Sequence, residues 1–151
     1  MNRPLGAAIR VNHQRLKTGR HHFILVSEQK NGRRMRCLGV GDAVQITRAI
    51  QNVIINAIQA SGDNKGTVEV TCIRKDFYVD VRIADTGHGI SPEQIAKIFD
   101  PYFTTKQGKS GTGLGLYITR KVVEDHNGSI KVDSTPEVGT TITIRLPLQS
   151  N

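Results

Sequence analysis

Residues 41–60, GDAVQITRAIQNVIINAIQA, predict a long amphipathic helix, and the other elements can be placed around it. Asp42 is a suitable N-cap, and Gln45 follows at the spacing of a capping box. Apolar residues recur at helical spacings and supply a broad buried face: Val44, Ile46, Ile50, Val53, Ile54, Ala57 and Ile58. Asn52 and Asn56 interrupt this apolar run four residues apart, so the helix places both amides on one face.

Alternating apolar and polar residues after this helix predict strands. Residues 67–73 and 77–85 are joined by the short segment RKD and predict an antiparallel hairpin with one buried face. In the second strand, the buried face is expected to consist of alternate residues: Phe77, Val79, Val81 and Ile83. Residues 129–134 and 140–147 predict two final strands.

Extended segments are also expected before the long helix. Residues 21–29 and 34–40 predict two strands, whereas residues 1–20 show no sustained period and predict an arm or an incomplete element. We therefore divide the chain into a basic N-terminal arm with a first strand, residues 1–36, and a single globular domain, residues 37–151.

Two further helices are expected after the hairpin. Ser91 caps a short helix, with Pro92 in its first turn and Gln94 as capping-box partner. A longer helix runs from residue 114 to about residue 126, with these residues on its inner side: Leu116, Ile118, Val122 and Val123. Amphipathic helices need a sheet face to cover, and hairpin-length connections make neighbouring strands antiparallel. The sequence thus predicts an α/β (α+β) fold, a two-layer sandwich in which helices cover one face of a mixed, mostly antiparallel sheet.

The net charge of +8 is confined to the N-terminal segment. Residues 1–36 hold nine basic residues and one acidic residue, whereas residues 37–151 hold twelve of each sign. The basic segment has a single aromatic residue, Phe23, and no helical pattern of basic residues. These features favour a solvated arm or a docking surface over a nucleic-acid site.

Cysteine usage and hydropathy indicate the cellular compartment in which the chain is expected. Cys37 and Cys72 lie far apart without paired Cys or Cys/His spacing, so neither a zinc site nor a disulfide framework is indicated, and we expect a cytoplasmic location. No run approaches the ~18 apolar residues of a membrane span, and residues 1–15 lack the apolar core of a signal peptide. We expect no membrane contact by this domain, although a longer parent protein could be anchored elsewhere.

Glycines gather at two places. Gly87 and Gly89 follow a predicted strand, and four more lie within residues 108–115, before a predicted helix. Such glycines let backbone N–H groups approach a phosphate at a helix N-terminus, although a merely flexible loop has the same composition. A P-loop is excluded because Phe103 stands where that motif requires glycine, and GxGxxG is excluded because Leu116 stands at its last position.

Asp85 closes a predicted strand beside the first glycine pair. Its carboxylate is expected either to cap the following turn or to point into a pocket and accept a hydrogen bond from an amino group such as that of adenine.

Four motifs follow one another along the chain. They are the asparagine-bearing helix, Asp-x-Gly-x-Gly at residues 85–89, FDPYFTTK at residues 99–106 and GTGLGL at residues 111–116. In this order and spacing they closely resemble the catalytic and ATP-binding domain of sensor histidine kinases, whose Bergerat fold is shared with DNA gyrase, mismatch-repair ATPases and chaperone ATPases. The resemblance covers about residues 37–148 and implies that the cofactors are ATP and Mg²⁺.

The resemblance assigns roles to residues of the first two motifs. It implies that Asn56 ligates Mg²⁺ through its side-chain oxygen, a donor that suits this hard ion. It implies that Asp85 accepts a hydrogen bond from the adenine amino group. Gly87 and Gly89 are expected to shape the pocket wall, and Ile90 to flank the base.

The later motifs imply contacts with the phosphates and the adenine. The backbone expected to wrap the phosphates belongs to Gly113, Leu114, Gly115 and Leu116. Lys106 is the possible catalytic residue of this chain, expected to meet the terminal phosphates as a point charge, with Lys109 as a weaker candidate. Thr140 matches a threonine near the adenine, although a strand-favouring surface threonine fits this position equally well.

FDPYFTTK resembles the hinge of the family's lid over the nucleotide, where Phe99 and Phe103 are expected to provide packing. The chain departs from the family at Ala60, where many sensor kinases carry a basic residue. Asn52 lies where ATP-hydrolysing relatives have a glutamate that activates water, and an amide lacks that basicity. We expect Asn52 to bind phosphate oxygens or metal-bound water instead.

None of the five histidines is followed by an acidic residue, as the family's phosphoacceptor is. We therefore expect an enzyme part that binds Mg²⁺–ATP and delivers the γ-phosphoryl group to a histidine on a separate dimerisation domain. The parent is expected to be a homodimer, with a response regulator as an indirect partner. The alternatives are a nucleotide-dependent binding module and an anti-sigma-type protein-serine kinase, of which the second fits FDPYFTTK and GTGLGL less well.

Overall fold

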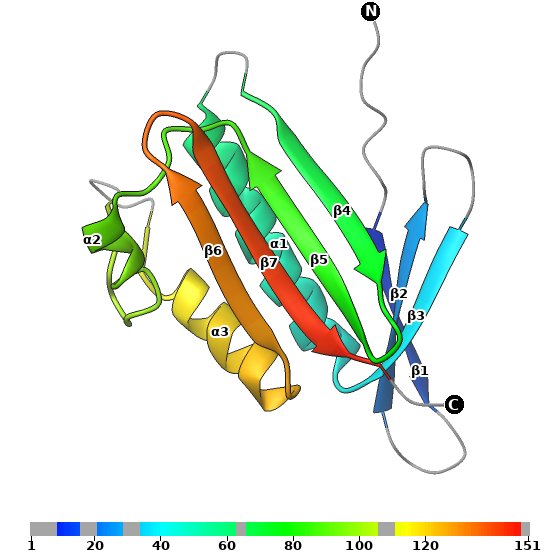
Figure 1. Cartoon of the computed structure of the whole chain (residues 1–151). Coiled ribbons are helices and arrows are strands. Elements are labelled where there is room, and N and C mark those ends of the chain that lie inside the picture. The colour runs from blue at the N-terminus through cyan, green and yellow to red at the C-terminus, as the bar shows by residue number, and fades with distance from the viewer. Residues whose placement is uncertain (1–8, 16–20, 29–33, 63–65, 106–110, 149–151) are drawn as a thin grey trace, which may run out of the picture.

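A four-stranded sheet covered on one face by helices forms the main unit of the computed structural model (Figure 1), which describes residues 9–15, 21–28, 34–62, 66–105 and 111–148. The strands are β4 (Val68–Arg74), β5 (Tyr78–Asp85), β6 (Ser129–Thr135) and β7 (Gly139–Pro147). They lie in the order β4-β5-β7-β6, and each neighbouring pair is antiparallel. The predicted fold class is confirmed, and the pairs within the described ranges are all antiparallel.

Two long helices make the second layer. α1 (Ala43–Ser61) contacts β4, β5 and β7, and Figure 1 shows it running behind the sheet. α3 (Gly115–Asp125) contacts β6 and β7 and lies alongside α1. A single short turn of helix, α2 (Pro92–Ile95), lies between β5 and α3 in the chain.

The core lies between these layers. Alternate residues of β5 and β7 form cross-strand pairs on the covered face, and each is at most 6% exposed: Val79 with Leu146, Val81 with Ile144, and Ile83 with Ile142. α1 adds Ala43, Ile46, Ile50, Val53 and Ala57. Burial of each Val or Ile side chain stabilises the fold by about 1.5–3 kcal/mol, so this interface dominates the packing energy.

Four apolar residues predicted to be buried are exposed, and the prediction is wrong for them. Val44 and Ile58 of α1 are each 57% exposed, and Ile118 of α3 is 50% exposed. All three lie outside the arcs that the buried residues occupy, which are Ala43, Ile46, Ala49, Ile50, Val53 and Ala57 on α1, and Thr119 and Val123 on α3. Phe77 is 73% exposed because β5 begins one residue later, outside the alternation.

The predicted helix caps are confirmed in part. Asp42 is the N-cap of α1, and its Oδ1 accepts from the backbone N–H groups of Val44 (2.8 Å) and Gln45 (3.3 Å). The reciprocal half of the predicted capping box does not form, because the Asp42 N–H donates to Nε2 of His126 (2.9 Å) instead. At α2, Ser91 and Gln94 form the predicted capping box in full.

The N-terminal strands form a separate antiparallel sheet in the order β1-β2-β3. β2 (His21–Glu28) and β3 (Arg34–Val40) match the predicted strands, and β3 spans the predicted domain boundary. β1 (Ile9–Arg15) lies in the segment expected to be an arm or incomplete element; its pairing with β2 compensates for its weak local pattern. Among the described residues, no helix has the length and apolar character needed to cross a membrane.

Candidate functional site

A row of polar residues continues the buried face of the sheet at one end. Asp85 on β5 pairs with Thr140 on β7, which pairs with Ser134 on β6. Because side chains alternate along a strand, these three lie on the covered face, one step beyond the apolar pair Ile83 and Ile142. The core therefore ends at a polar edge beneath α1.

Thr140 is buried in this row, only 6% exposed. Its Oγ1 lies 2.8 Å from Oγ of Ser134, and that hydroxyl also donates to the Gly139 carbonyl (3.0 Å) and accepts from the Ile90 N–H (2.8 Å). The alternative of a surface threonine is therefore wrong. Ser134 was not predicted, although its position two residues beyond Val132 in the strand alternation placed it on the covered face.

Asp85 caps the turn that follows its strand. Its Oδ1 accepts from the Gly87 N–H at 2.8 Å, which confirms the turn-capping interpretation. This contact does not exclude a ligand, since a carboxylate offers about four acceptor positions and Asp85 is only partly buried.

The glycines after Asp85 allow close backbone contacts. A Cβ on Gly87 would overlap the Ala60 carbonyl oxygen at the end of α1, and one on Gly89, whose φ is 71°, would overlap the Thr135 carbonyl oxygen of β6. His88 between them donates its backbone N–H to Ala60 (3.3 Å). Residues 87–89 thus bridge α1 and β6, and form a wall at the polar end of the sheet.

Asn52 and Asn56 lie one turn apart on α1, so they share one helix face, and both are partly buried. Nδ2 of Asn52 donates to the Gly115 carbonyl (2.9 Å) and lies 3.5 Å from Oγ1 of Thr119. Thr119 is fully buried and donates to the same carbonyl at 2.9 Å. The amide-bearing face of α1 therefore contacts the start of α3.

The start of α3 has the features of a phosphate-binding turn. Gly113 has a φ of 68°, and a Cβ there would overlap the Tyr102 backbone, which donates its N–H to the Gly113 carbonyl at 2.9 Å. Leu114 is the N-cap residue and its own side chain makes no capping hydrogen bond, while its backbone N–H donates to Oγ1 of Thr112 at 3.4 Å. Leu116 lies in the first turn, partly buried. Helix N-termini favour anions through their N–H groups and dipole.

Phe99, in the segment expected to form the lid hinge, contacts α3. Phe99 is partly buried, and the guanidinium carbon of Arg120 lies 5.5 Å from its ring centroid, a cation–π contact. Phe103 is also partly buried. Lys106 and Lys109 lie outside the described residues, so their roles stay predictions.

Glu93 lies in the first turn of α2, just before the hinge. A hydrogen bond from its own backbone N–H, and a second from the Ser91 side chain, lower the pKa of its carboxyl below the ordinary value. The charged form therefore stabilises the start of this short helix.

The residues present fit Mg²⁺–ATP. The described ranges contain no cluster of three His, Cys, Asp or Glu side chains able to hold a metal ion by themselves. Mg²⁺ in nucleotide sites is typically held by one or two protein oxygens together with phosphate oxygens and water, which is the arrangement that Asn56 and the start of α3 would support.

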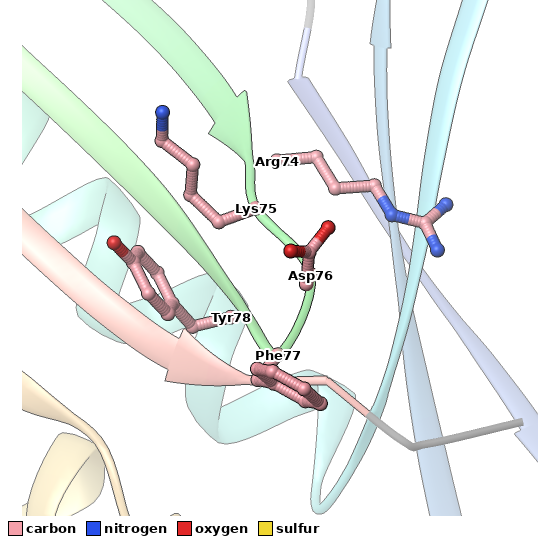
Figure 2. Close-up of a pocket in the computed structure, with 5 residues that line it drawn as sticks. All are labelled: Arg74, Lys75, Asp76, Phe77 and Tyr78. Carbon is pink, nitrogen blue, oxygen red and sulfur yellow. The ribbon is translucent and has the colours of Figure 1, made fainter.

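A cavity of about 610 Å³ lies at the β4–β5 turn, lined by Arg74, Lys75, Asp76, Phe77 and Tyr78 (Figure 2). The side chains of Arg74 and Lys75 point away from each other, so the polar groups do not converge. Tyr78 and Asp85 are opposite ends of β5, separated by about 23 Å at the usual rise per residue, so this cavity is not part of the polar site.

Known proteins share both the sequence and the fold. The family described as histidine kinase-, DNA gyrase B-, and HSP90-like ATPase (HATPase_c) matches residues 41–150. Sensor histidine kinase ZraS of Escherichia coli (strain K12) is 36% identical over 137 residues, 85% of this chain and 29% of that kinase. Sporulation kinase B of Bacillus subtilis (strain 168) is 36% identical over 107 residues, 71% of this chain and 24% of that kinase. The chain thus spans less than a third of the length of these relatives.

Solved structures agree with this relationship. The mycobacterial sensor histidine kinase MprB superposes with a TM-score of 0.68 at 31% identity, covering 76% of this chain and 79% of its own. The catalytic domain of histidine kinase ThkA gives 0.64 at 34% identity, covering 74% and 72%. This chain therefore belongs to the histidine kinase-, DNA gyrase B- and HSP90-like ATPase family, and within it is the catalytic, ATP-binding domain of a histidine kinase.

Proposed function

We propose that this domain binds Mg²⁺–ATP and transfers the γ-phosphoryl group to a histidine on a separate dimerisation domain of its parent kinase. The observation that carries the proposal is the hydrogen bond from Asn52 to the Gly115 carbonyl, 2.9 Å. It brings the helix face that carries Asn56 against the start of α3, where the N-cap residue Leu114 has no side-chain cap of its own. A metal-ligating amide and a phosphate-binding turn are then neighbours.

In this proposal each part of the chain has a distinct task. Asp85 accepts from the adenine amino group through acceptor positions that Gly87 does not use, and Thr140 and Ile90 border the base. N–H groups at Gly113–Leu116 hold the phosphates, and Asn56 holds the metal. Bound Mg²⁺ supplies neutralisation of phosphate charge. The chain contributes mainly position and charge.

The residue at position 52 is consistent with phosphoryl transfer to a histidine and not to water. Its side chain is an amide that donates to Gly115, and an amide has no basicity with which to activate water. The acceptor histidine would come from the dimerisation domain of a homodimeric parent. That histidine would in turn pass the phosphoryl group to a response regulator. We place this domain in the cytoplasm, without nucleic-acid or membrane contact of its own.

The test of adenine recognition is Asp85→Asn. Asparagine can still accept from the Gly87 N–H through Oδ1, so the turn is retained, but its NH₂ group would then oppose the amino group of adenine. We expect ATP affinity to fall at least tenfold by equilibrium titration, with little change in unfolding. Asp133→Asn, an exposed carboxylate of β6 that pairs with Lys131, is the charge-matched control. Unchanged ATP affinity in the Asp85 variant would show that the adenine assignment is wrong.

The test of transfer mixes the domain with γ-labelled ATP and the separately made histidine-bearing hairpin of the parent. Acid-labile label on the hairpin is the expected result. ATP binding without transfer would support a binding module instead, and acid-stable label on serine would support a protein-serine kinase of the anti-sigma type.

A further inference from the structure

His126 connects the end of α3 with the start of α1. It is the C-cap residue of α3 and is 8% exposed. Its Nε2 lies 2.9 Å from the backbone nitrogen of Asp42, and its Nδ1 lies 2.6 Å from the Val122 carbonyl oxygen. One side chain thus bridges two elements that are 84 residues apart in sequence.

The two partners fix the state of the ring. A backbone N–H can only donate and a carbonyl can only accept, so Nε2 must be the bare acceptor and Nδ1 must carry the proton. These two contacts define one tautomer of the ring, with the proton on Nδ1. A proton on Nε2 would point at the Asp42 N–H, so two donors would face each other without an acceptor.

Gly41 makes room for this bridge. Its φ is 148°, and a Cβ at this position would overlap Cδ2 of the imidazole. The loop before α1 can therefore pass over the ring only with glycine at this position. Four residues build this contact, and none of them was assigned a role in binding the nucleotide: Gly41, Asp42, Val122 and His126.

A second link joins the same two helices at the other end of α3, from Asn52 to Gly115. The links are ten residues apart on α1 and eleven residues apart on α3, which corresponds to about 15 Å and 16 Å at the rise of an α-helix. The matching lengths fix the relative register of the two antiparallel helices. A helix held at both ends cannot slide along its neighbour.

We propose that His126 is a positioning residue for the nucleotide site, an inference that rests on the proposed function. By holding α3 in register with α1, it sets the distance between Asn56 and the phosphate-binding turn at Gly113–Leu116. Mg²⁺ requires near-ideal octahedral geometry with short metal–oxygen distances, so a shift of about 1 Å between these elements weakens a bridged metal more than it weakens the nucleotide alone.

The test compares two amide substitutions in the whole chain. In His126→Gln the amide oxygen can reach the place of Nε2 and accept from Asp42, whereas in His126→Asn the shorter side chain reaches only the place of Nδ1. We expect His126→Asn to weaken Mg²⁺–ATP binding about fivefold, the effect of one lost hydrogen bond, and His126→Gln to retain most of the affinity. In titrations with ATP and a chelator that removes Mg²⁺, we expect a smaller loss of affinity for His126→Asn. A general loss of folding would instead reduce ATP affinity to the same extent with and without Mg²⁺.

A measurement on the unaltered chain covers the case in which a variant fails to fold. Nitrogen-15 NMR of the imidazoles should show His126 protonated on Nδ1 and not on Nε2. The opposite tautomer, or a folded His126→Asn variant that binds Mg²⁺–ATP like the wild type, would overturn the positioning role. A wild-type chain that binds no Mg²⁺–ATP would instead refute the proposed function itself, and the inference with it.

Discussion

Asp85 and Thr140 are directly paired residues of β5 and β7, and both side chains lie on the sheet face that α1 covers. The preceding pair on that face, Ile83 and Ile142, is 1% and 6% exposed. The polar site is therefore a direct extension of the hydrophobic core, and its side chains are held by the same strand pairing that holds the core. Substitutions in the apolar cross-strand pairs of β5 and β7 should therefore also alter the geometry of the polar site.

Thr140→Val tests the buried polar row. Valine keeps the shape but removes the hydroxyl that lies 2.8 Å from Ser134 Oγ, so we expect the free energy of unfolding to fall by about 1 kcal/mol in urea titrations. Thr135→Val, an exposed position on the opposite face of β6, is the control and should stay within about 0.5 kcal/mol of wild type. Equal effects of the two substitutions would contradict a buried hydroxyl pair.

Gly113→Ala tests the close approach between the start of α3 and the hinge. Both Gly113 and Gly62 have φ near +65°, but only at Gly113 would a Cβ overlap backbone, that of Tyr102. We expect Gly62→Ala to lose about 1–3 kcal/mol of stability from backbone strain alone, and Gly113→Ala to lose more and also to bind ATP more weakly. Thermal unfolding and ATP titration measure the two effects. Similar losses for both would mean that the overlap is relieved by local movement.

Ile46→Ala and Ile58→Ala test the orientation of α1. Ile46 is 1% exposed and Ile58 is 57% exposed. Truncation of Ile46 removes packing atoms and leaves a cavity, so we expect a loss of about 2–5 kcal/mol, against less than about 0.5 kcal/mol for Ile58. Urea unfolding distinguishes these values. A large loss at Ile58 would show that this residue is covered in solution.

Glu93→Gln tests the charged start of α2. The pKa of Glu93 is lowered in the folded chain, so its ionised form contributes stability that is present above the ordinary glutamate pKa and is lost as pH falls through the folded value. We expect the variant to be less stable than wild type at neutral pH, and the difference to disappear in acid below both pKa values. Thermal unfolding at a series of pH values measures this. A difference that persists in acid would point to a cause other than ionisation.

Local patterns sufficed for most elements of the main sheet and its helices. The alternation in β5 and β7 predicted both strands and their buried faces, since a strand with one covered face must alternate. The pattern failed for Val44 and Ile58 of α1, which are apolar but exposed. Hydrophobicity alone does not report which arc of a broad apolar helix meets the sheet. β1 was missed because its order comes from pairing with β2.

The candidate site divides in the same way. Asn56, Asp85 and Gly113–Leu116 could be assigned to the candidate site because each belongs to a local motif of fixed spacing. Ser134, Thr119 and His126 were not assigned to the site, because their partners are remote in sequence: Ile90 for Ser134, Asn52 for Thr119 and Asp42 for His126. A hydrogen bond between residues so far apart in the sequence produces no periodic pattern from which it could be predicted.

The sequence by itself determined the fold class, the order of the elements from β2 to β7 and the residue types expected of a nucleotide site, because turn chemistry, hydrophobic period and motif spacing are local properties. Only the tertiary structure decided how the amide of Asn52 is used. It commits the Nδ2 of Asn52 to the Gly115 carbonyl, one turn away from Asn56 on the same helix. That choice depends on the register between α1 and α3, which is set by packing on a common sheet and by links at both helix ends, and no single segment of the chain contains that information.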